Sequence, residues 1–352
     1  MNIDNQRSAR CCRIVSVLLV ATQLSSISPI QAEPLAVGEV HKVRQFSHGS
    51  HIYQVAFSPD GKLVATNDQV WESETGRKVA SLPVHSGDHA PGNFWLAFSP
   101  DSRHAAIHRF RDVVLVEAKN GKQVWKVGLP PRAAIRERTP RLAFTADGKM
   151  LLSVRNDEKI VRIWDVGNGK EMRHFPFAPD ADGQNGADII SFGVADDAQR
   201  LVVHYAVSGN NGVPVMLKLA TGDELHRYWV SSADAWVQFS SVSPDGNLLA
   251  YSRKGAVHLL DLMSGREPLK LESVGQHAFY VSFSPDGTRI AASIRPARET
   301  QDWIQCWEWS TGKTICVFKV QAGVTSFTFS PDGKQILAGG SDQKATLWRL
   351  PE

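Results

Sequence analysis

A short phrase that recurs seven times constrains this chain more than any other feature of its sequence. Residues 57–61 (FSPDG) are its intact form, which returns at 283–287 and 329–333, while four further copies are degenerate. The acidic residues that anchor the copies follow one another at intervals of 41 to 49 residues: Asp60, Asp101, Asp147, Asp196, Asp245, Asp286 and Asp332. Self-similarity at this period is typical of repeat folds in which one supersecondary unit stacks on the next.

Each copy predicts the same four strands. An alternating apolar segment, such as residues 53–57, precedes the phrase and predicts a strand. Within the phrase proline presets φ, aspartate accepts bonds from the backbone, and glycine takes the left-handed conformation that closes a hairpin. Two more strands, a second turn and a fourth strand follow, and this second turn carries Gly76, Gly121, Gly169, Gly222, Gly265 and Gly312. The sequence therefore predicts an all-β fold, a seven-bladed β-propeller of four-stranded antiparallel blades over residues 40–352.

The two ends of this region predict how the ring closes. The last copy stops at Leu350-Pro351-Glu352, directly after its third strand, and residues 40–46 form an orphan strand before the first copy. We expect the orphan to pair with residues 345–350 and complete the seventh blade. Closure would remove two open sheet edges, which otherwise invite aggregation.

Composition and the first residues bear on localisation. The chain has 352 residues, 42% hydrophobic and 21% charged, as in globular proteins, and its net charge of +3 indicates no nucleic-acid partner. A basic start, a short apolar run at 14–24 and a small-residue ending predict a signal peptide over residues 1–32, cleaved after Ala32. The alternative is a membrane anchor through residues 14–30. We expect an exported protein, periplasmic or secreted, that is a monomeric ring with no membrane span after cleavage.

Two segments resemble the WD40 repeat family. They are residues 161–166 (VRIWDV) and 345–350 (ATLWRL), and the FSPDG copies are similar to those of bacterial members. The resemblance covers residues 40–352 and implies a hydrogen-bonded set of His, Asp, Ser or Thr, and Trp in each blade. Trp164 with Asp157, and Trp348 with Asp342, keep two members each, and the Gly-His pair is absent from nearly every blade. We therefore expect this set to be eroded.

Residues that could support catalysis or metal binding are sparse. His104 and His108 read as strand, where four residues span about 13 Å, too far for one metal ion. His85 and His89 lie in a loop that could hold zinc, although a polar loop is the simpler interpretation. Residues 117–125 resemble one repeat of quinone-dependent dehydrogenases, but those enzymes repeat it around eight blades. We expect no catalytic residues, no metal and no cofactor.

The cysteines of the predicted mature chain are Cys306 and Cys316. They flank the predicted turn at 310–313 symmetrically, which would place them opposite each other across a hairpin. In an oxidising compartment they could form a disulfide if their Cα atoms lie about 4.4–6.8 Å apart. Two small apolar side chains in a blade are the alternative, and the role is structural in both cases.

Strand alternation places both kinds of tight turn on one side of the ring. The length variation falls in the connections on the other side: residues 83–93, 128–140, 176–187, 208–213, 231–235 and 294–302. Insertions confined to one face of a repeat array usually mark its binding face. The charged residues predicted to bind there are Arg132, Arg136, Arg138, Asp180, Asp182, Arg295 and Arg298.

Two classes of function compete for such a ring. The first is a non-catalytic scaffold whose variable-loop face binds a protein or peptide, with its arginines important for binding and of little effect on folding. Service in envelope assembly is a version of this hypothesis that differs only in the partner. The rival is an exported hydrolase or lactonase-like enzyme with a metal in the central channel.

Overall fold

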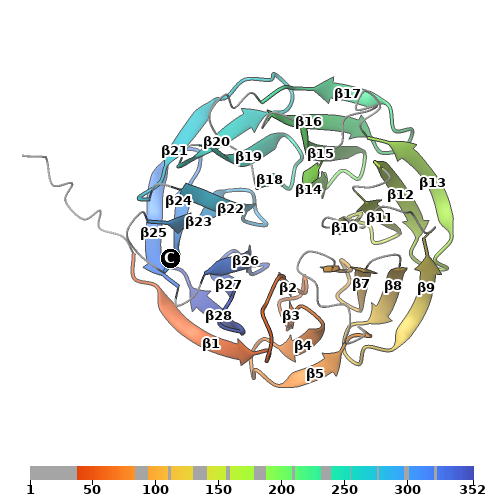
Figure 1. Ribbon diagram of the computed structural model, residues 1–352, viewed down its shortest axis with the longest axis horizontal. Helices are drawn as coiled ribbons and strands as arrows, with labels where there is room; N and C mark the ends of the chain where they lie inside the picture. The colour runs from red at the N-terminus through yellow and green to blue at the C-terminus, as the bar shows by residue number, and fades with distance from the viewer. Residues whose placement is uncertain are drawn as a thin grey trace, which may run out of the picture. The chain divides into compact units, whose positions relative to one another are not determined.

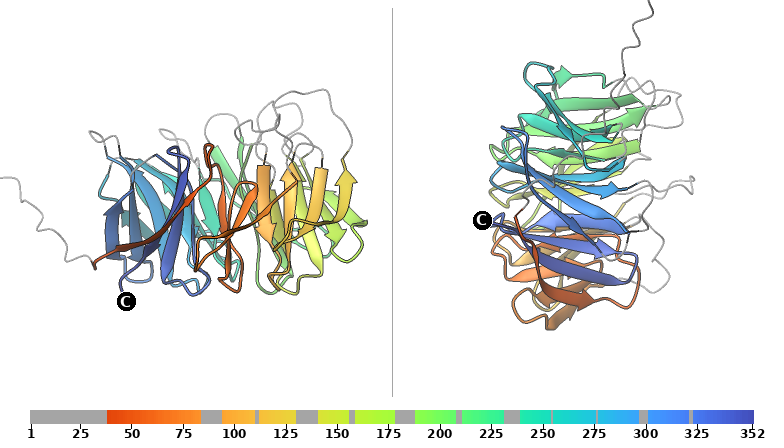
Figure 2. Two further views of the ribbon diagram at one scale, coloured as in Figure 1. Left: turned by 90° about the horizontal axis from the view of Figure 1, so that it is seen from below. Right: turned by 90° about the vertical axis from the view of Figure 1, so that its left-hand side faces the viewer.

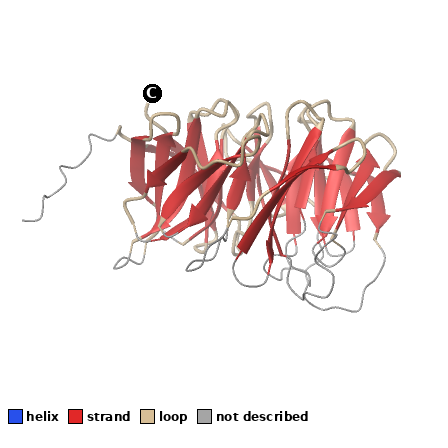
Figure 3. Ribbon diagram, turned by 90° about the horizontal axis from the view of Figure 1, so that it is seen from above, coloured by secondary structure: helices blue, strands red, loops and turns tan. Residues whose placement is uncertain are grey.

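Seven four-stranded antiparallel sheets form a ring in the computed structural model (Figure 1). The structure describes residues 38–83, 94–109, 112–129, 141–155, 159–177, 188–207, 211–230, 239–253, 255–275, 277–296, 301–320 and 323–352. Within these ranges every regular element is a strand (Figure 3). None of these residues belongs to a helix long and apolar enough to cross a membrane. The predicted seven-bladed propeller is confirmed, while the predicted signal peptide lies outside the described residues.

The strands of blades 1 to 4, from the channel outwards, are β2 (Val55–Phe57), β3 (Leu63–Thr66), β4 (Gln69–Glu72), β5 (Lys78–Ser81); β6 (Phe94–Phe98), β7 (His104–Arg109), β8 (Asp112–Glu117), β9 (Gln123–Gly128); β10 (Arg141–Phe144), β11 (Met150–Arg155), β12 (Ile160–Asp165), β13 (Glu171–Pro176); β14 (Asp188–Val194), β15 (Arg200–Val207), β16 (Asn211–Lys218) and β17 (Glu224–Arg227). Those of blades 5 to 7 are β18 (Ser240–Val242), β19 (Leu248–Arg253), β20 (Ala256–Asp261), β21 (Leu269–Glu272); β22 (His277–Phe283), β23 (Arg289–Arg295), β24 (Trp303–Glu308), β25 (Lys313–Lys319); β26 (Val324–Phe329), β27 (Gln335–Gly340), β28 (Lys344–Arg349) and β1 (His41–Ser47).

The recurring phrase forms the turn between the first two strands of a blade. In blade 1 the Ser58 hydroxyl donates to Asp60 Oδ1 (2.7 Å), and the same oxygen accepts the backbone N–H of Lys62 (3.0 Å). Gly61 has φ +72°, as predicted. In blade 3 the hydrogen bonds from Thr145 and the backbone of Lys149 lower the pKa of Asp147. The turn therefore satisfies its own polar groups.

The predicted closing strand is confirmed. β1 pairs antiparallel with β28, from His41 opposite Arg349 to Ser47 opposite Lys344, with a bulge between Lys42 and Arg44. Phe46 from this strand is 1% exposed and lies in the apolar core that blade 7 shares with blade 1. The first described strand therefore completes the last blade.

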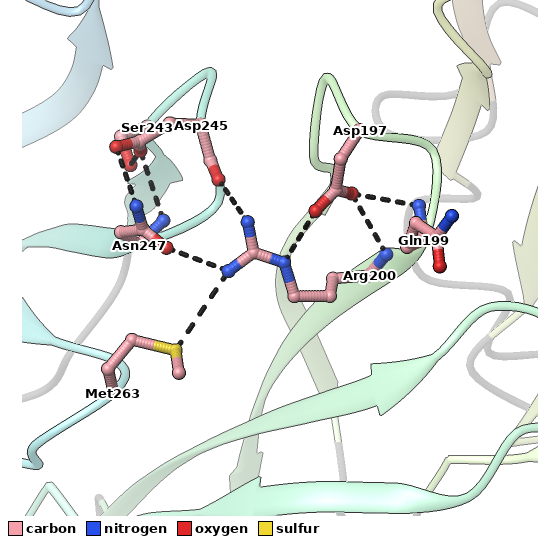
Figure 4. A network of polar contacts seen from close by, with 7 residues as sticks. All are labelled: Asp197, Gln199, Arg200, Ser243, Asp245, Asn247 and Met263. Carbon is pink, nitrogen blue, oxygen red and sulfur yellow. Dashed lines mark hydrogen bonds and ion pairs between the residues drawn. The ribbon is translucent and has the colours of Figure 1, made fainter.

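Blade 4 replaces the phrase by residues 194–198, and an arginine supplies a different junction with blade 5 (Figure 4). Arg200 Nε donates to Asp197 Oδ2 (2.8 Å) within its own blade. Its Nη2 donates to the carbonyl oxygen of Asp245 (2.8 Å), and its Nη1 donates to Asn247 Oδ1 (2.7 Å), both in the turn of blade 5. One guanidinium thus ties together the tight turns of two neighbouring blades.

Aromatic residues of three outer strands dock on the second-turn glycine of the following blade. Trp125 donates its indole N–H to the carbonyl oxygen of Val166 (2.8 Å), and a Cβ added to Gly169 would lie 2.8 Å from its ring. Equivalent contacts join Phe175 to Gly222, and Tyr228 to its glycine in blade 5. These turns need glycine both for their positive φ and for the close approach of a ring.

Candidate functional site

The candidate site is a cavity at one mouth of the central channel. Its volume is about 650 Å³, and its lining comes from segments at or just before the beginnings of the innermost strands and from the first half of those strands. Each innermost strand begins where a connection on the variable-loop side ends, so this mouth opens on that face (Figures 1 and 2). Its lining includes four aromatic side chains and several hydroxyls, with His51 and Arg141 as its basic groups among the described residues.

The mouth is built largely from one repeated position, three residues before the last residue of each innermost strand. Gln54, Trp95, Arg141, Ser191, Phe239, Tyr280 and Ser326 occupy it in blades 1 to 7. Several of these residues contact the next blade. Gln54 Nε2 donates to the carbonyl oxygen of Leu96 (2.7 Å), and Gln54 Oε1 accepts the N–H of Leu96 (2.7 Å). The rings of Phe239 and Tyr280 lie with centroids 4.0 Å apart.

Arg141 places a fixed positive charge in this wall. Its guanidinium carbon lies 4.2 Å from the centre of the Trp95 ring, and its Nη2 donates to the carbonyl oxygen of Ile190 (3.3 Å). Burial lowers the pKa of Arg141 to about 10, so the side chain is still a cation at neutral pH. Burial also raises the pKa of Tyr280, whose phenol therefore stays protonated. The described lining includes no Asp or Glu.

Two serines beside the arginine are positioned by a buried histidine. Ser240 Oγ donates to Ser191 Oγ (2.6 Å), and His204 Nδ1 lies 2.7 Å from Ser240 Oγ. Burial lowers the pKa of His204 to about 3, so its ring is neutral at pH 7. A Cβ on Gly212 would lie 2.3 Å from His204 Nε2, which shows how closely the backbone covers this ring. The hydroxyls of blades 4 and 5 therefore have fixed positions.

Blade 1 carries the full polar set that the WD40 resemblance implies, and the expectation that no blade keeps more than two members is wrong here. Trp71 Nε1 donates to Thr66 Oγ1 (2.9 Å), and His48 Nδ1 lies 3.2 Å from the same hydroxyl. His48 Nε2 lies 3.3 Å from Asp68 Oδ1. The sequence concealed this set because Gly49 follows the histidine instead of preceding it.

In the two blades chosen from sequence the polar set is thinner. Trp164 Nε1 donates to Ser153 Oγ (2.8 Å), whereas Asp157 lies outside the described residues. Trp348 Nε1 is buried and has no hydrogen-bond partner within the described ranges. Erosion of the set in these blades is therefore visible in their side chains.

The predicted binding residues fall mostly outside the described residues. This is so for Arg132, Arg136, Arg138, Asp180, Asp182 and Arg298, and also for the loop histidines His85 and His89. Arg295 is described, and its Nε and Nη2 donate to Asp302 Oδ1 (2.8 Å) and Oδ2 (3.1 Å). Asp302 is 2% exposed, so Arg295 neutralises a buried carboxylate. The expectation that this arginine contributes little to folding does not fit that geometry.

One predicted connection is shorter than expected. The sequence suggested a loop over residues 208–213, but β16 begins at Asn211, which pairs with Val207, and Val213 pairs with Tyr205. Strand pairing therefore extends into residues that their Gly and Asn content had assigned to a loop. At the other end of the chain, Cys306 lies opposite Cys316 in the register of β24 and β25, as predicted. Both are buried, free thiols in the structure, and the bond between them stays a prediction.

A second hollow, of about 780 Å³, lies on the tight-turn face. It is lined by charged residues of blade 1, among them Asp60, Lys62, Glu72 and Arg77. Arg77 forms an ion pair with Glu72 and lowers the pKa of that carboxyl. These charges neutralise one another at an exposed surface, so we assign the site to the smaller cavity at the channel mouth.

The sequence had a signal for the channel mouth that the prediction did not use. The innermost strands were taken as apolar packing from the triplets that end them, such as residues 142–144. The position directly before each triplet varies among aromatic, hydroxyl and basic residues, whereas the triplets are similar. Variation at one fixed position of a repeat indicates a surface that serves recognition, and it would have identified Arg141.

Two family models match the chain. The model described as outer membrane protein assembly factor BamB matches residues 34–268, and the model described as WD domain, G-beta repeat, matches residues 312–349. The chain is 31% identical over 143 residues to Centriole proteome protein 16 of Chlamydomonas reinhardtii, covering 39% of this chain and 6% of that protein. It is 27% identical over 127 residues to WD repeat-containing protein SL1-17 of Schistosoma mansoni, covering 36% of this chain and 40% of that protein. The chain thus spans less than half the length of either relative.

Proposed function

The chain belongs to the propeller family described as outer membrane protein assembly factor BamB, with WD40-like repeats, and from this premise we propose a non-catalytic scaffold of the bacterial cell envelope. The protein is exported, and its variable-loop face, including the channel mouth, binds a protein or peptide partner. One observation carries the proposal: the cavity on this face is walled by aromatic rings, hydroxyls and an arginine. Aromatic residues and arginine are the types most enriched at the energetic centres of protein interfaces.

The fixed geometry of the mouth supports binding rather than chemistry. Its side chains are held by contacts between blades, such as the two bonds from Gln54 to Leu96 and the stacking of Arg141 on Trp95. A ligand that docks on positions already fixed loses little additional ordering entropy. The buried histidine beside the hydroxyls has its pKa lowered to about 3, well below the range that suits a general base at neutral pH.

Site-specific photo-crosslinking in producing cells tests this assignment of face. Tyr53 lines the mouth, and replacing it with p-benzoylphenylalanine keeps an aromatic ring there. Lys62, an exposed residue of the tight-turn face, is the matched control. We expect one discrete protein adduct from position 53 and none from position 62. Adducts from position 62 alone, or from neither position, would refute binding through the loop face.

A further inference from the structure

The inference concerns what the channel mouth recognises, and it rests on the proposed function. Among the described lining residues the charged or chargeable basic groups are Arg141 and His51, and no carboxylate accompanies them. The guanidinium is not an isolated surface charge, because Trp95 stacks on it and the carbonyl oxygen of Ile190 accepts from Nη2. The cavity therefore favours an anionic group over a neutral or cationic one.

Hydroxyl donors lie next to this cation. Arg141 is bonded to Ile190, the residue directly before Ser191, so the guanidinium lies against the same strand as that serine. Ser191 Oγ accepts the proton of Ser240, and its own hydroxyl proton is not donated to any described residue. His204 Nδ1 fixes Ser240 from behind. A guanidinium with an adjacent hydroxyl is a donor set that suits the two oxygens of a carboxylate.

Aromatic rings flank these donors. Trp95 lies under the guanidinium, while Phe239 and Tyr280 stack on the side of blades 5 and 6. Such rings bind apolar atoms next to a charged group and reduce the water around it, which strengthens the charged hydrogen bond. A free small anion would leave these walls without a contact. An acidic side chain in a peptide brings both the charge and the apolar neighbours.

We propose that the channel mouth binds an aspartate or glutamate side chain of the partner protein, with Arg141 and Ser191 donating to its carboxylate and the aromatic rings contacting the flanking residues. The site takes one carboxylate from an extended segment that enters the mouth from the loop face. A phosphate or a chain terminus offers related oxygens, and the experiment below separates these sources.

Terminally blocked pentapeptides test the proposal, because their carboxylates come from side chains alone. The probes are pentapeptides with Leu at positions 2 and 4 and with Glu, Asp, Gln or Asn at position 3, each measured by fluorescence anisotropy on the full chain. We expect Glu or Asp peptides to bind about ten- to a hundredfold more tightly than the matched amides, as for a hydrogen bond to a charged group. Arg141→Gln should abolish this preference, and Arg141→Lys should keep part of it. Lys62→Gln, on the opposite face, should leave it intact.

A second variant protects the test against misfolding of the arginine variant. Ser191→Ala removes one donor without changing charge, and we expect a several-fold loss of the Glu-over-Gln preference with an unchanged melting temperature. Equal binding of acidic and amide peptides, including no binding of either, would overturn the proposal. So would a preference for inorganic phosphate, or for the same peptides with a free C-terminus, that exceeds the preference for the side chain. If position 53 still crosslinks to a partner in that case, the scaffold function stands and only the carboxylate assignment falls.

Discussion

Truncation of Phe46 to alanine tests how strongly the closing strand holds the ring together. The side chain is 1% exposed, lies in the core shared by blades 7 and 1, and meets the Trp71 ring at a centroid distance of 6.0 Å. Phe→Ala at a buried site costs about 3–5 kcal/mol, and we expect about 3 kcal/mol because an outer strand can partly collapse onto the space. That is a large share of the roughly 5–15 kcal/mol that stabilises a domain.

Urea unfolding followed by tryptophan fluorescence measures this loss. With a urea dependence of about 3 kcal/mol per molar, the midpoint of Phe46→Ala should fall by about 1 M. Val43→Ala is the matched control, since Val43 lies in the bulge of the same strand and is 38% exposed. Its free energy of unfolding should change by less than about 1 kcal/mol. If the two variants unfold at the same urea concentration, docking of β1 does not stabilise the ring and the reasoning fails.

Three other predictions concern single side chains. Gly222→Ala should cost about 2–4 kcal/mol, because φ is +81° and the new Cβ would lie 2.4 Å from the ring docked there, whereas Gly333→Ala, at φ +68° with open space, should cost only about 1–2 kcal/mol; equal urea midpoints would exclude the steric term. Burial lowers the pKa of His108 to about 3, so the unfolded chain takes up its proton first and stability falls as the pH drops from about 6.5 towards 3. His108→Leu should therefore lose about 2 kcal/mol less than the wild type between pH 7 and pH 5 in urea titrations, and identical losses would contradict this. Arg295→Gln should cost about 2 kcal/mol in thermal melts, since Asp302 stays buried without its cation, and an unchanged melting temperature would refute the structural role of that pair.

The fold was predictable from the sequence because its determinants are local. A turn such as residues 58–61 is specified by its own serine, proline, aspartate and glycine, and its hydrogen bonds stay within five residues. Seven repetitions of that local signal left only the ring closure to infer, and the unpaired segment before the first copy predicted β1 correctly. The signal tolerates loss of glycine, since Ser102 and Ala198 take its place with φ of 62° and 52°.

The site was less predictable because its contacts join different blades. Arg141 meets Trp95, which lies 46 residues earlier, and Ile190, which lies 49 residues later. Neither contact follows from strand periodicity, since both depend on how neighbouring blades face each other once the ring has formed. His48 was missed for the same reason, as it reaches Thr66 and Asp68 across the junction of two blades. Long loops also drew attention to charges within them and away from the strand ends that they precede.

The pairing of β1 with β28 has a consequence for the order of folding. During synthesis the strand at His41–Ser47 leaves the ribosome first and its partner at Lys344–Arg349 leaves last. The first strand must therefore wait, with its hydrogen-bonding edge unpaired, until almost the whole chain is available. Contacts so distant in sequence form late and slowly, because the loop that they close is long. A chain interrupted before its final blade would keep two sticky edges and be a target for proteases or chaperones, so ring closure also acts as a check that synthesis has been completed.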